Sequence, residues 1–405
     1  MIEQQLNLIW DVGSVFTPSA PIDDSALFAG RESQLAKIGG AVSQRGQHVV
    51  IYGERGVGKT SLANVLFDLL KKRPERFQIA RINCEEKTTF SSLWHSVFRA
   101  LSVTQETSSA GFKSNNTNEE VPASVYLPID VKPDDVRYMF QQIGKQTVVI
   151  IDELDRIEDE ETTTRLADTI KTLSDNSTST TLVLVGVGDS VDDLIKEHKS
   201  VERALVQILM PRMSKDEIIE IVNKGLNRLN MSIDLNAKNK IVQLSRELPH
   251  YTHLLCKHAA QEALIEGRKS IALQDVLNAL EVALEQAQQS IVRTYHTATS
   301  SPRGNLYTEV LLACALAPRD ELGYFSSAGV RPHLSRIMHK KYEIPAFARH
   351  LNDFNSEERG AVLERTGYPR RYKFRFRNPL MEPYVIMNGL KKSLITEGDL
   401  EMAVA

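Results

Sequence analysis

The chain has 405 residues, more than one ordinary hydrophobic core holds, so we expect two or three packed domains. Hydrophobic residues make up 42% and charged residues 25% of it, as in soluble globular proteins, and no apolar run approaches the ~18 residues of a membrane span. The three cysteines are too few and too widely spaced for a disulfide framework or a zinc site, and the first residues lack the layout of a secretory signal. These features predict a cytoplasmic protein with no membrane partner.

The net charge of −3 conceals a separation of charge along the chain. Between Arg293 and Lys392 there are 17 Lys/Arg and 9 Asp/Glu, a local balance of +8, so the rest of the chain has a balance of −11. A basic C-terminal part could contact a polyanion such as double-stranded DNA. It could equally dock on an acidic domain of the same or a neighbouring chain, and charge alone does not separate these two interpretations.

From about residue 47 to residue 187, short β-rich runs alternate with longer amphipathic stretches. This pattern predicts an α/β fold, a parallel sheet sandwiched by helices. The expected strands are continuous apolar runs, as buried parallel strands should be: His48–Tyr52, Phe77–Asn83, 147–151 and 181–187. The polar segment 107–118 predicts a mobile loop.

Beyond Pro211 the pattern changes to amphipathic helices, the first of which begins with a capping box of Ser214 and Glu217. A linker at 297–305 separates these helices from a second helical group and from a β-hairpin with a basic turn at 362–376. The predicted parts are an α/β domain, a helical domain, a basic domain and an acidic tail, at 1–212, 213–296, 297–392 and 393–405.

The clearest motif lies between the first expected strand and the helix that follows it. The run from Gly53 to Thr60 fits the phosphate-binding loop (P-loop) pattern G-x-x-x-x-G-K-[ST] without a gap. Glycines let backbone N–H groups turn toward phosphates, Lys59 reaches the β- and γ-phosphates, and the Thr60 hydroxyl binds magnesium. A chance match would occur in about one chain of this length in a hundred, so we expect ATP and Mg2+ as cofactors. The predicted nucleotide-binding residues of this motif are Gly53, Glu54, Arg55, Gly56, Val57, Gly58, Lys59, Thr60 and Ser61.

A pair of carboxylates follows the apolar run 147–151. Asp152 is placed to hold hydrated magnesium, and Glu153 to act as the general base toward the attacking water. An acidic loop that merely solubilises a strand end is the alternative, since further acidic residues occupy 158–161. Together with the P-loop, the pair favours hydrolysis of a nucleoside triphosphate.

With both motifs placed, the chain resembles the AAA+ ATPases, especially the bacterial or archaeal initiator branch related to origin-recognition proteins. It also resembles the ATPases that regulate transposon target choice. The resemblance extends from Phe16 to about Leu390 and implies a homo-oligomer with a helical lid domain. It further implies a winged-helix-like C-terminal domain, with 344–354 as the recognition helix and 362–376 as the wing. In this family, the segment LFAGRESQL, which contains Arg31, lines the adenine pocket.

The chain departs from the family pattern at both nucleotide sensors. Asp189 and Ser190 are the only polar candidates for the first sensor. The second sensor is usually an arginine, but the matching residue is His250, which could instead be a helix-capping or core histidine. Arg203 matches the arginine that completes a neighbouring subunit's site, and Arg212 is a lesser candidate. An ordinary surface arginine is the alternative for Arg203.

The motifs and the resemblance predict an ATPase that hydrolyses Mg-ATP at subunit interfaces, with Glu153, Lys59 and Arg203 as catalytic residues. Nucleotide state would then control oligomeric assembly on DNA or on a protein partner. A winged helix docks proteins as well as DNA, so the partner of the basic hairpin stays open. The basic residues of this hairpin are Arg365, Arg370, Arg371 and Lys373. The alternative function is an ATP-gated scaffold or sensor that hydrolyses little and recruits a protein effector, for example in anti-phage defence.

Overall fold

The computed structural model describes residues 2–108, 116–195, 199–301, 305–369, 371–396 and 398–400. These residues divide into two compact units. The α/β unit comprises the described parts of Ile22–Gly53 and Gly58–Met210, and the helical unit those of Met1–Pro21, Glu54–Val57 and Pro211–Ala405. The four-part division expected from the sequence stays a prediction.

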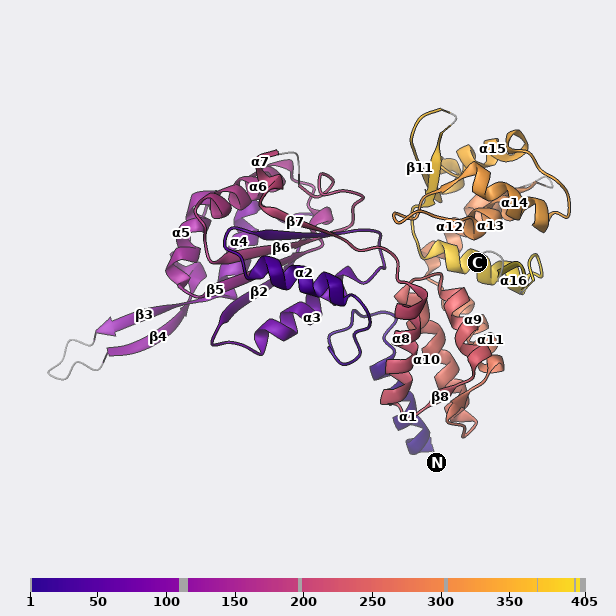
Figure 1. Cartoon of the computed structure of the whole chain (residues 1–405), viewed down its shortest axis with the longest axis horizontal. Helices are drawn as coiled ribbons and strands as arrows, with labels where there is room; N and C mark the ends of the chain where they lie inside the picture. Colours follow the sequence, from indigo (N-terminus) through magenta and orange to yellow (C-terminus); the bar gives the residue numbers. More distant parts are fainter. Residues whose placement is uncertain are drawn as a thin grey trace. The chain divides into compact units, whose positions relative to one another are not determined.

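The α/β unit is built on a five-stranded parallel sheet with the strand order β2-β5-β6-β1-β7 (Figure 1). The strands are β1 (His48–Tyr52), β2 (Phe77–Asn83), β5 (Gln146–Asp152), β6 (Thr180–Val185) and β7 (Leu205–Leu209). Successive side chains of β5, such as Val149 and Ile150, point to opposite faces and are both fully buried. The continuous apolar runs therefore form buried parallel strands, which confirms the predicted α/β class.

Helices cover both faces of this sheet (Figure 1). On one face, α2 (Glu32–Val42) contacts β1 and β7, and α3 (Lys59–Lys71) contacts β2, β5 and β6. On the other face, α4 (Phe90–Arg99), α5 (Pro133–Ile143) and α6 (Glu160–Asp175) share one apolar core with the strands. Trp94, Phe98 and Phe140 form its aromatic centre, with ring centroids 4.8–5.8 Å apart. Such large buried rings fix the helix layer on the sheet.

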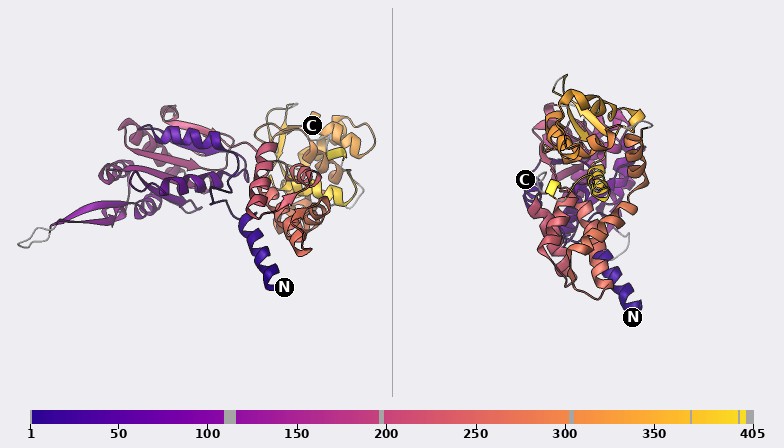
Figure 2. Two further views of the ribbon diagram at one scale, coloured as in Figure 1. Left: turned by 60° about the horizontal axis from the view of Figure 1, so that its bottom comes forward. Right: turned by 90° about the vertical axis from the view of Figure 1, so that its right-hand side faces the viewer.

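A β-hairpin interrupts the α/β order between α4 and α5 and projects away from the parallel sheet (Figure 2). Its strands are β3 (Ser102–Ser108) and β4 (Asn116–Pro122), and η1 (Ala123–Tyr126) follows. They pair antiparallel from Ser102↔Pro122 to Ser108↔Asn116. The expected loop over 107–118 was therefore wrong at both ends, because main-chain hydrogen bonds pair antiparallel strands whatever their polarity. The centre of that segment, 109–115, lies outside the described residues.

In the helical unit, α10 (Pro249–Ile265) is the central helix. It contacts α1 (Ile2–Val15), α8 (Lys215–Arg228), α9 (Leu235–Ser245) and α11 (Leu273–Glu285). The predicted capping box is present. Ser214 Oγ accepts from the Glu217 backbone N–H at 3.2 Å, and Glu217 Oε2 accepts from the Ser214 backbone N–H at 2.8 Å. A short parallel pair, β8 (Ser232–Ile233) and β9 (Ser270–Ile271), joins the inter-helix loops. No helix within the described ranges is long and apolar enough to cross a membrane.

The basic C-terminal part combines helices with a three-stranded antiparallel sheet of order β10-β12-β11. The strands are β10 (Phe325–Ser326), β11 (Leu363–Thr366) and β12 (Lys373–Phe376), and the last two form the predicted hairpin. The helices are α12 (Gln289–Thr299), α13 (Tyr307–Leu316), α14 (Ser327–Ile337), α15 (Ile344–Asp353), the short η3 (Glu357–Arg359) and α16 (Met381–Lys391). Helix α15 covers most of the predicted recognition helix, but the winged-helix assignment itself stays a prediction.

Candidate functional site

The P-loop leaves β1 at Gly53 and enters α3 at Lys59. Gly53, Gly56 and Gly58 have φ values of 143°, 85° and 96°, a region that L-residues with side chains rarely adopt. A Cβ atom on Gly53 would lie 2.5 Å from the carbonyl oxygen of Met210, so this position requires glycine on steric grounds as well. Gly58 is the N-cap of α3 and has no side chain with which to satisfy the first N–H groups of the helix. This conformation therefore suits a bound phosphate.

The side chains at the start of α3 are held in defined positions. Lys59 is only 7% exposed, and its Nζ donates to the carbonyl oxygen of Gly53 at 2.8 Å. Ser61 Oγ accepts from the backbone N–H of Ile22 at 3.2 Å, which fixes the segment that precedes α2. Thr60 lies between them in the first turn of α3. A buried ammonium group close to glycines with left-handed backbone has the charge and place to bind the phosphates of a nucleotide.

The carboxylates predicted to handle magnesium and water lie at the carboxyl end of β5. Asp152 is 2% exposed, and its Oδ1 accepts from the Glu153 backbone N–H at 2.9 Å. Its Oδ2 accepts from Arg81 Nη2 at 3.0 Å. Strand β6 separates β5 from β1, and because all strands are parallel, Asp152 and the P-loop share the carboxyl edge of the sheet. This edge is where α/β sheets bind ligands.

Glu153 has a left-handed backbone with φ 57°, an unusual conformation for a residue with a side chain. It begins the short helix η2 (Leu154–Arg156), and its carboxylate accepts from Arg156 Nη1 at 3.0 Å. The Glu153 side chain is 45% exposed, so water can reach it. Strained backbone of this kind is commonly retained at functional sites.

Two further aspartates shape the loop that follows β6. Asp155 Oδ1 accepts from the backbone N–H of Val187 at 2.7 Å. The backbone N–H groups of Asp189 and Ser190, the candidates for the first sensor, both donate to Asp193 Oδ2, at 2.7 and 2.9 Å. These contacts make the loop a compact turn beside the end of β5.

The buried Cys84 lies next to the acidic residues at this edge. Burial, together with the charges of Asp152, Glu153 and Asp155, raises the pKa of the neighbouring Cys84 thiol to about 12. Within the described ranges, no group of three or more His, Cys, Asp or Glu side chains could hold a metal alone. Magnesium usually takes one or two protein ligands and completes its shell with phosphate oxygens and water. Thr60 and Asp152 fit that requirement.

The remaining predicted site residues lie apart from these carboxylates or in the other unit. Arg31 is buried, with φ 64°, at the N-cap of α2. His250, in the helical unit, donates from Nδ1 to the carbonyl oxygen of Pro18 at 2.7 Å, and burial lowers its pKa, which favours the neutral ring. Arg203 is 74% exposed and pairs with Asp175 at 2.8 Å.

Arg203 lies at the edge of the sheet opposite the carboxylates. It precedes β7 and is therefore at the amino edge, whereas Asp152 is at the carboxyl edge. It follows the short helix α7 (Lys199–Glu202). Within one chain, Arg203 and Glu153 are thus at opposite edges of the sheet, so Arg203 is not part of its own chain's site.

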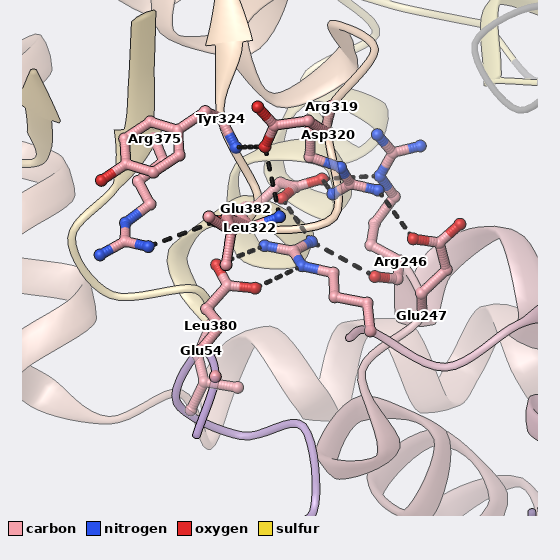
Figure 3. A network of polar contacts seen from close by, with 12 residues as sticks. Glu54, Arg246, Glu247, Arg319, Asp320, Leu322, Tyr324, Arg375, Leu380 and Glu382 are labelled. Carbon is pink, nitrogen blue, oxygen red and sulfur yellow. Dashed lines mark hydrogen bonds and ion pairs between the residues drawn. The ribbon is translucent and has the colours of Figure 1, made fainter. Parts of the chain in front are cut away.

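A buried charge network in the helical unit includes the P-loop residue Glu54 (Figure 3). Arg212 donates to both Glu54 oxygens, at 2.7 and 2.9 Å, and to Glu382 at 2.7 Å. Arg246 donates to Glu382 at 2.8 Å, and Arg319 pairs with the same carboxylate. Burial alone would raise the pKa of Glu382, but the three guanidinium groups hold it well below its usual range. Arg212 itself is only 8% exposed, so it is engaged within its own chain.

Sequence reasoning missed Arg81 and the partners of Glu54. One signal was available for Arg81, because a single arginine interrupts the apolar run of β2, and a charged residue within a buried strand needs a partner. The motif pattern places no restriction on the residue type at Glu54.

Comparison with known families finds a match in the first half of the chain. A family model described as an AAA domain matches residues 42–195. This range contains the P-loop, Asp152 and Glu153, so this part of the chain is similar to an AAA domain. The match does not extend to residues 196–405.

Similar proteins occur among archaea. An uncharacterized HTH-type transcriptional regulator of Methanocaldococcus jannaschii is 22% identical over 312 residues, which cover 67% of this chain and 75% of that protein. A Walker-type ATPase of Pyrococcus abyssi has a TM-score of 0.51 at 17% identity. The match covers 91% of this chain and 98% of that one, so the two share a fold. The ORC1 protein of Aeropyrum pernix, solved in complex with DNA, has a TM-score of 0.49 at 12% identity, with 96% and 98% covered.

Proposed function

We propose that this protein binds Mg-ATP on its P-loop and hydrolyses it. One observation carries the proposal: Lys59 and the glycine-led start of α3 share a sheet edge with the adjacent carboxylates Asp152 and Glu153. The shared edge supports the proposal, because phosphate binding and proton transfer would then be carried out by residues close to one another.

Each residue has a separate task in this mechanism. Lys59, which donates to the carbonyl oxygen of Gly53, would turn its ammonium group to the β- and γ-phosphates. Thr60 and Asp152 would hold magnesium, which neutralises charge on the phosphates when bound. Glu153 would leave Arg156 and accept a proton from the attacking water.

The test is calorimetric titration of the full chain with ATP and magnesium, followed by a hydrolysis assay. Unmutated protein should bind ATP, and Lys59→Ala should lose tight binding while its circular dichroism spectrum stays unchanged. Equal ATP affinity in the two proteins would refute the P-loop assignment.

We also propose that ATP is hydrolysed at interfaces between copies of the chain. Arg203 supports this, because it is exposed and lies at the sheet edge opposite its own chain's carboxylates. A neighbouring copy could receive it as the cation that neutralises the γ-phosphate. Nucleotide state would then control assembly.

The partner that we favour for the basic C-terminal part is double-stranded DNA. Arg365 of the hairpin donates to Asn352 of α15 at 2.8 Å, so hairpin and helix present one continuous surface. Arg349 on α15 is 88% exposed, and Arg371 on the hairpin is also exposed. The relative named as an HTH-type transcriptional regulator agrees with this proposal. Arg370 lies outside the described residues.

One observation favours the alternative, an ATP-gated scaffold or sensor that recruits a protein effector. The proposed base Glu153 is paired with Arg156 at 3.0 Å, so its carboxylate must leave an ion pair before it can act on water. Single-turnover hydrolysis with and without duplex DNA separates the two functions. Turnover that stays negligible in both conditions would put the scaffold first.

A further inference from the structure

Arg81 connects the phosphate-binding helix to the carboxylate proposed to handle magnesium. From the middle of β2, its Nη2 donates to Asp152 Oδ2 at 3.0 Å. Its Nη1 donates to Asn64 Oδ1 in the second turn of α3. The guanidinium group therefore spans the helix that begins with Lys59 and the strand that ends with Asp152.

Both oxygens of Asp152 accept hydrogen bonds from within the chain. Oδ1 accepts from the Glu153 backbone, and Oδ2 accepts from Arg81. Asp152 is 2% exposed, and a buried carboxylate without a counter-charge is strongly unfavourable. Arg81 supplies that charge from a side chain that is itself 22% exposed.

We propose that Arg81 is a positioning residue that holds the Asp152 carboxylate and competes with magnesium for its charge. The inference rests on the proposed Mg-ATP function. A cation 3.0 Å from one carboxylate oxygen reduces the attraction between that carboxylate and a second cation. Because the site is buried, solvent screens this competition only weakly. The affinity of the ATP complex for magnesium is therefore set partly by Arg81.

The test measures the contribution of magnesium to nucleotide binding without relying on activity. A non-hydrolysable ATP analogue is titrated into the full chain by calorimetry, once with EDTA and once with excess magnesium. The ratio of the two dissociation constants reports the metal's contribution. The variants are Arg81→Met, which removes the charge, and Arg73→Met, which removes an exposed arginine before the opposite end of β2.

We expect Arg81→Met to increase this ratio by about tenfold, which corresponds to about 1.4 kcal/mol, while Arg73→Met leaves it unchanged. Affinity in EDTA should stay within about twofold, because Arg81 is bonded to Asp152 and Asn64, not placed toward the phosphates. The rise in melting temperature caused by magnesium and the analogue should also be larger in Arg81→Met.

Two results would overturn the inference. An unchanged ratio would mean that Arg81 only stabilises the fold, and a lower affinity in EDTA would mean that it binds the nucleotide. If Arg81→Met does not fold, Arg81→Gln removes the charge but keeps a polar side chain that can still donate to a carboxylate. It should raise the ratio as well, and no rise contradicts the inference. Absence of analogue binding by unmutated protein would instead refute the proposed function.

Discussion

The carboxylate of Glu54 accepts two hydrogen bonds from the guanidinium group of Arg212, at 2.7 and 2.9 Å. Paired donors of this kind fix both side chains in one geometry. Arg212 also bonds to Glu382 on α16, so a P-loop residue is linked to the last described long helix of the chain. The conformation of the loop at Glu54 thus depends on residues far along the sequence.

The first prediction concerns Glu382, the common partner of three arginines in this network. Glu382→Gln should lower the free energy of unfolding by about 3–5 kcal/mol, because it leaves the buried Arg246 without its carboxylate. Arg212 and Arg319 also lose one of their two carboxylate partners. The matched control is Glu357→Gln, an exposed residue paired with Arg377, which should cost about 1 kcal/mol or less. Urea denaturation measures both, and equal losses would show that the network adds nothing specific.

The second prediction concerns His48, at the start of the strand that leads to the P-loop. Its Nδ1 accepts from the backbone N–H of Leu182 at 3.0 Å, and burial lowers its pKa from 6.5 to about 4. The unfolded chain therefore binds a proton near pH 6.5 that the folded chain takes up only near pH 4. His48 thus contributes full stability above pH 6.5, and this contribution is lost as pH falls toward 4.

The loss should reach about 3 kcal/mol at the acidic end of this window. His48→Gln removes the titrating group. The unfolding free energy of this variant should therefore change less with pH, by a slope that corresponds to up to about one bound proton. Unfolding free energies between pH 4 and 8 measure this, with His296→Gln, at an exposed histidine, as the control. If the unfolding free energies of His48→Gln and unmutated protein depend on pH in the same way, His48 is not the source of the pH dependence.

The third prediction tests the base. Glu153→Gln should keep ATP and magnesium binding but lower turnover by about 100-fold or more, because an amide cannot accept the proton of the attacking water. Arg156→Ala should instead raise turnover by up to about fivefold, because it frees the Glu153 carboxylate from an exposed ion pair. Glu158→Gln, at an exposed acidic residue of the same segment, is the control. If turnover of Glu153→Gln stays within about twofold of that of unmutated protein, another residue is the general base, and Asp155 is the next candidate.

The sequence was most informative where a local pattern determines local structure. The apolar runs at β1 and β5 predicted the parallel sheet, and the glycines of the P-loop predicted the edge that we propose binds the nucleotide, because neighbouring residues impose these conformations. It did not reveal that Arg81 pairs with Asp152, 71 residues away, or that Glu54 pairs with Arg212, 158 residues away. Such pairings depend on how the chain returns to itself, and no spacing rule records them.

The fourth prediction tests whether Arg203 acts on a neighbouring copy. Arg203→Ala and Glu153→Gln should each be inactive alone. Mixed together, they should recover part of the activity, because some interfaces then combine an intact Glu153 from one copy with an intact Arg203 from the other. Turnover is measured across mixing ratios, with co-assembly checked by size-exclusion chromatography. If the two proteins assemble together and no ratio recovers activity, Arg203 has another role.

The last prediction concerns what the basic C-terminal part touches. Arg349 on α15 and Arg371 on the hairpin are exposed, and each could neutralise one phosphate of a duplex. Replacing both with alanine should weaken duplex binding equally for all sequences and lower the salt slope by about two, since each lost contact releases about one fewer counterion. ATP turnover without DNA should be unchanged, because neither residue lies in the range 42–195, which contains the P-loop and Glu153.

The control for this prediction is Arg99→Ala, an exposed arginine on α4 of the α/β unit, which should leave the slope unaltered. Fluorescence anisotropy with a labelled duplex, titrated at several salt concentrations with ATP present, gives the slope. If unmutated protein binds no duplex even at about 50 mM salt, where phosphate contacts are strongest, the basic surface is a protein-docking face. The scaffold function would then be favoured, because it does not require Glu153 to leave its ion pair with Arg156.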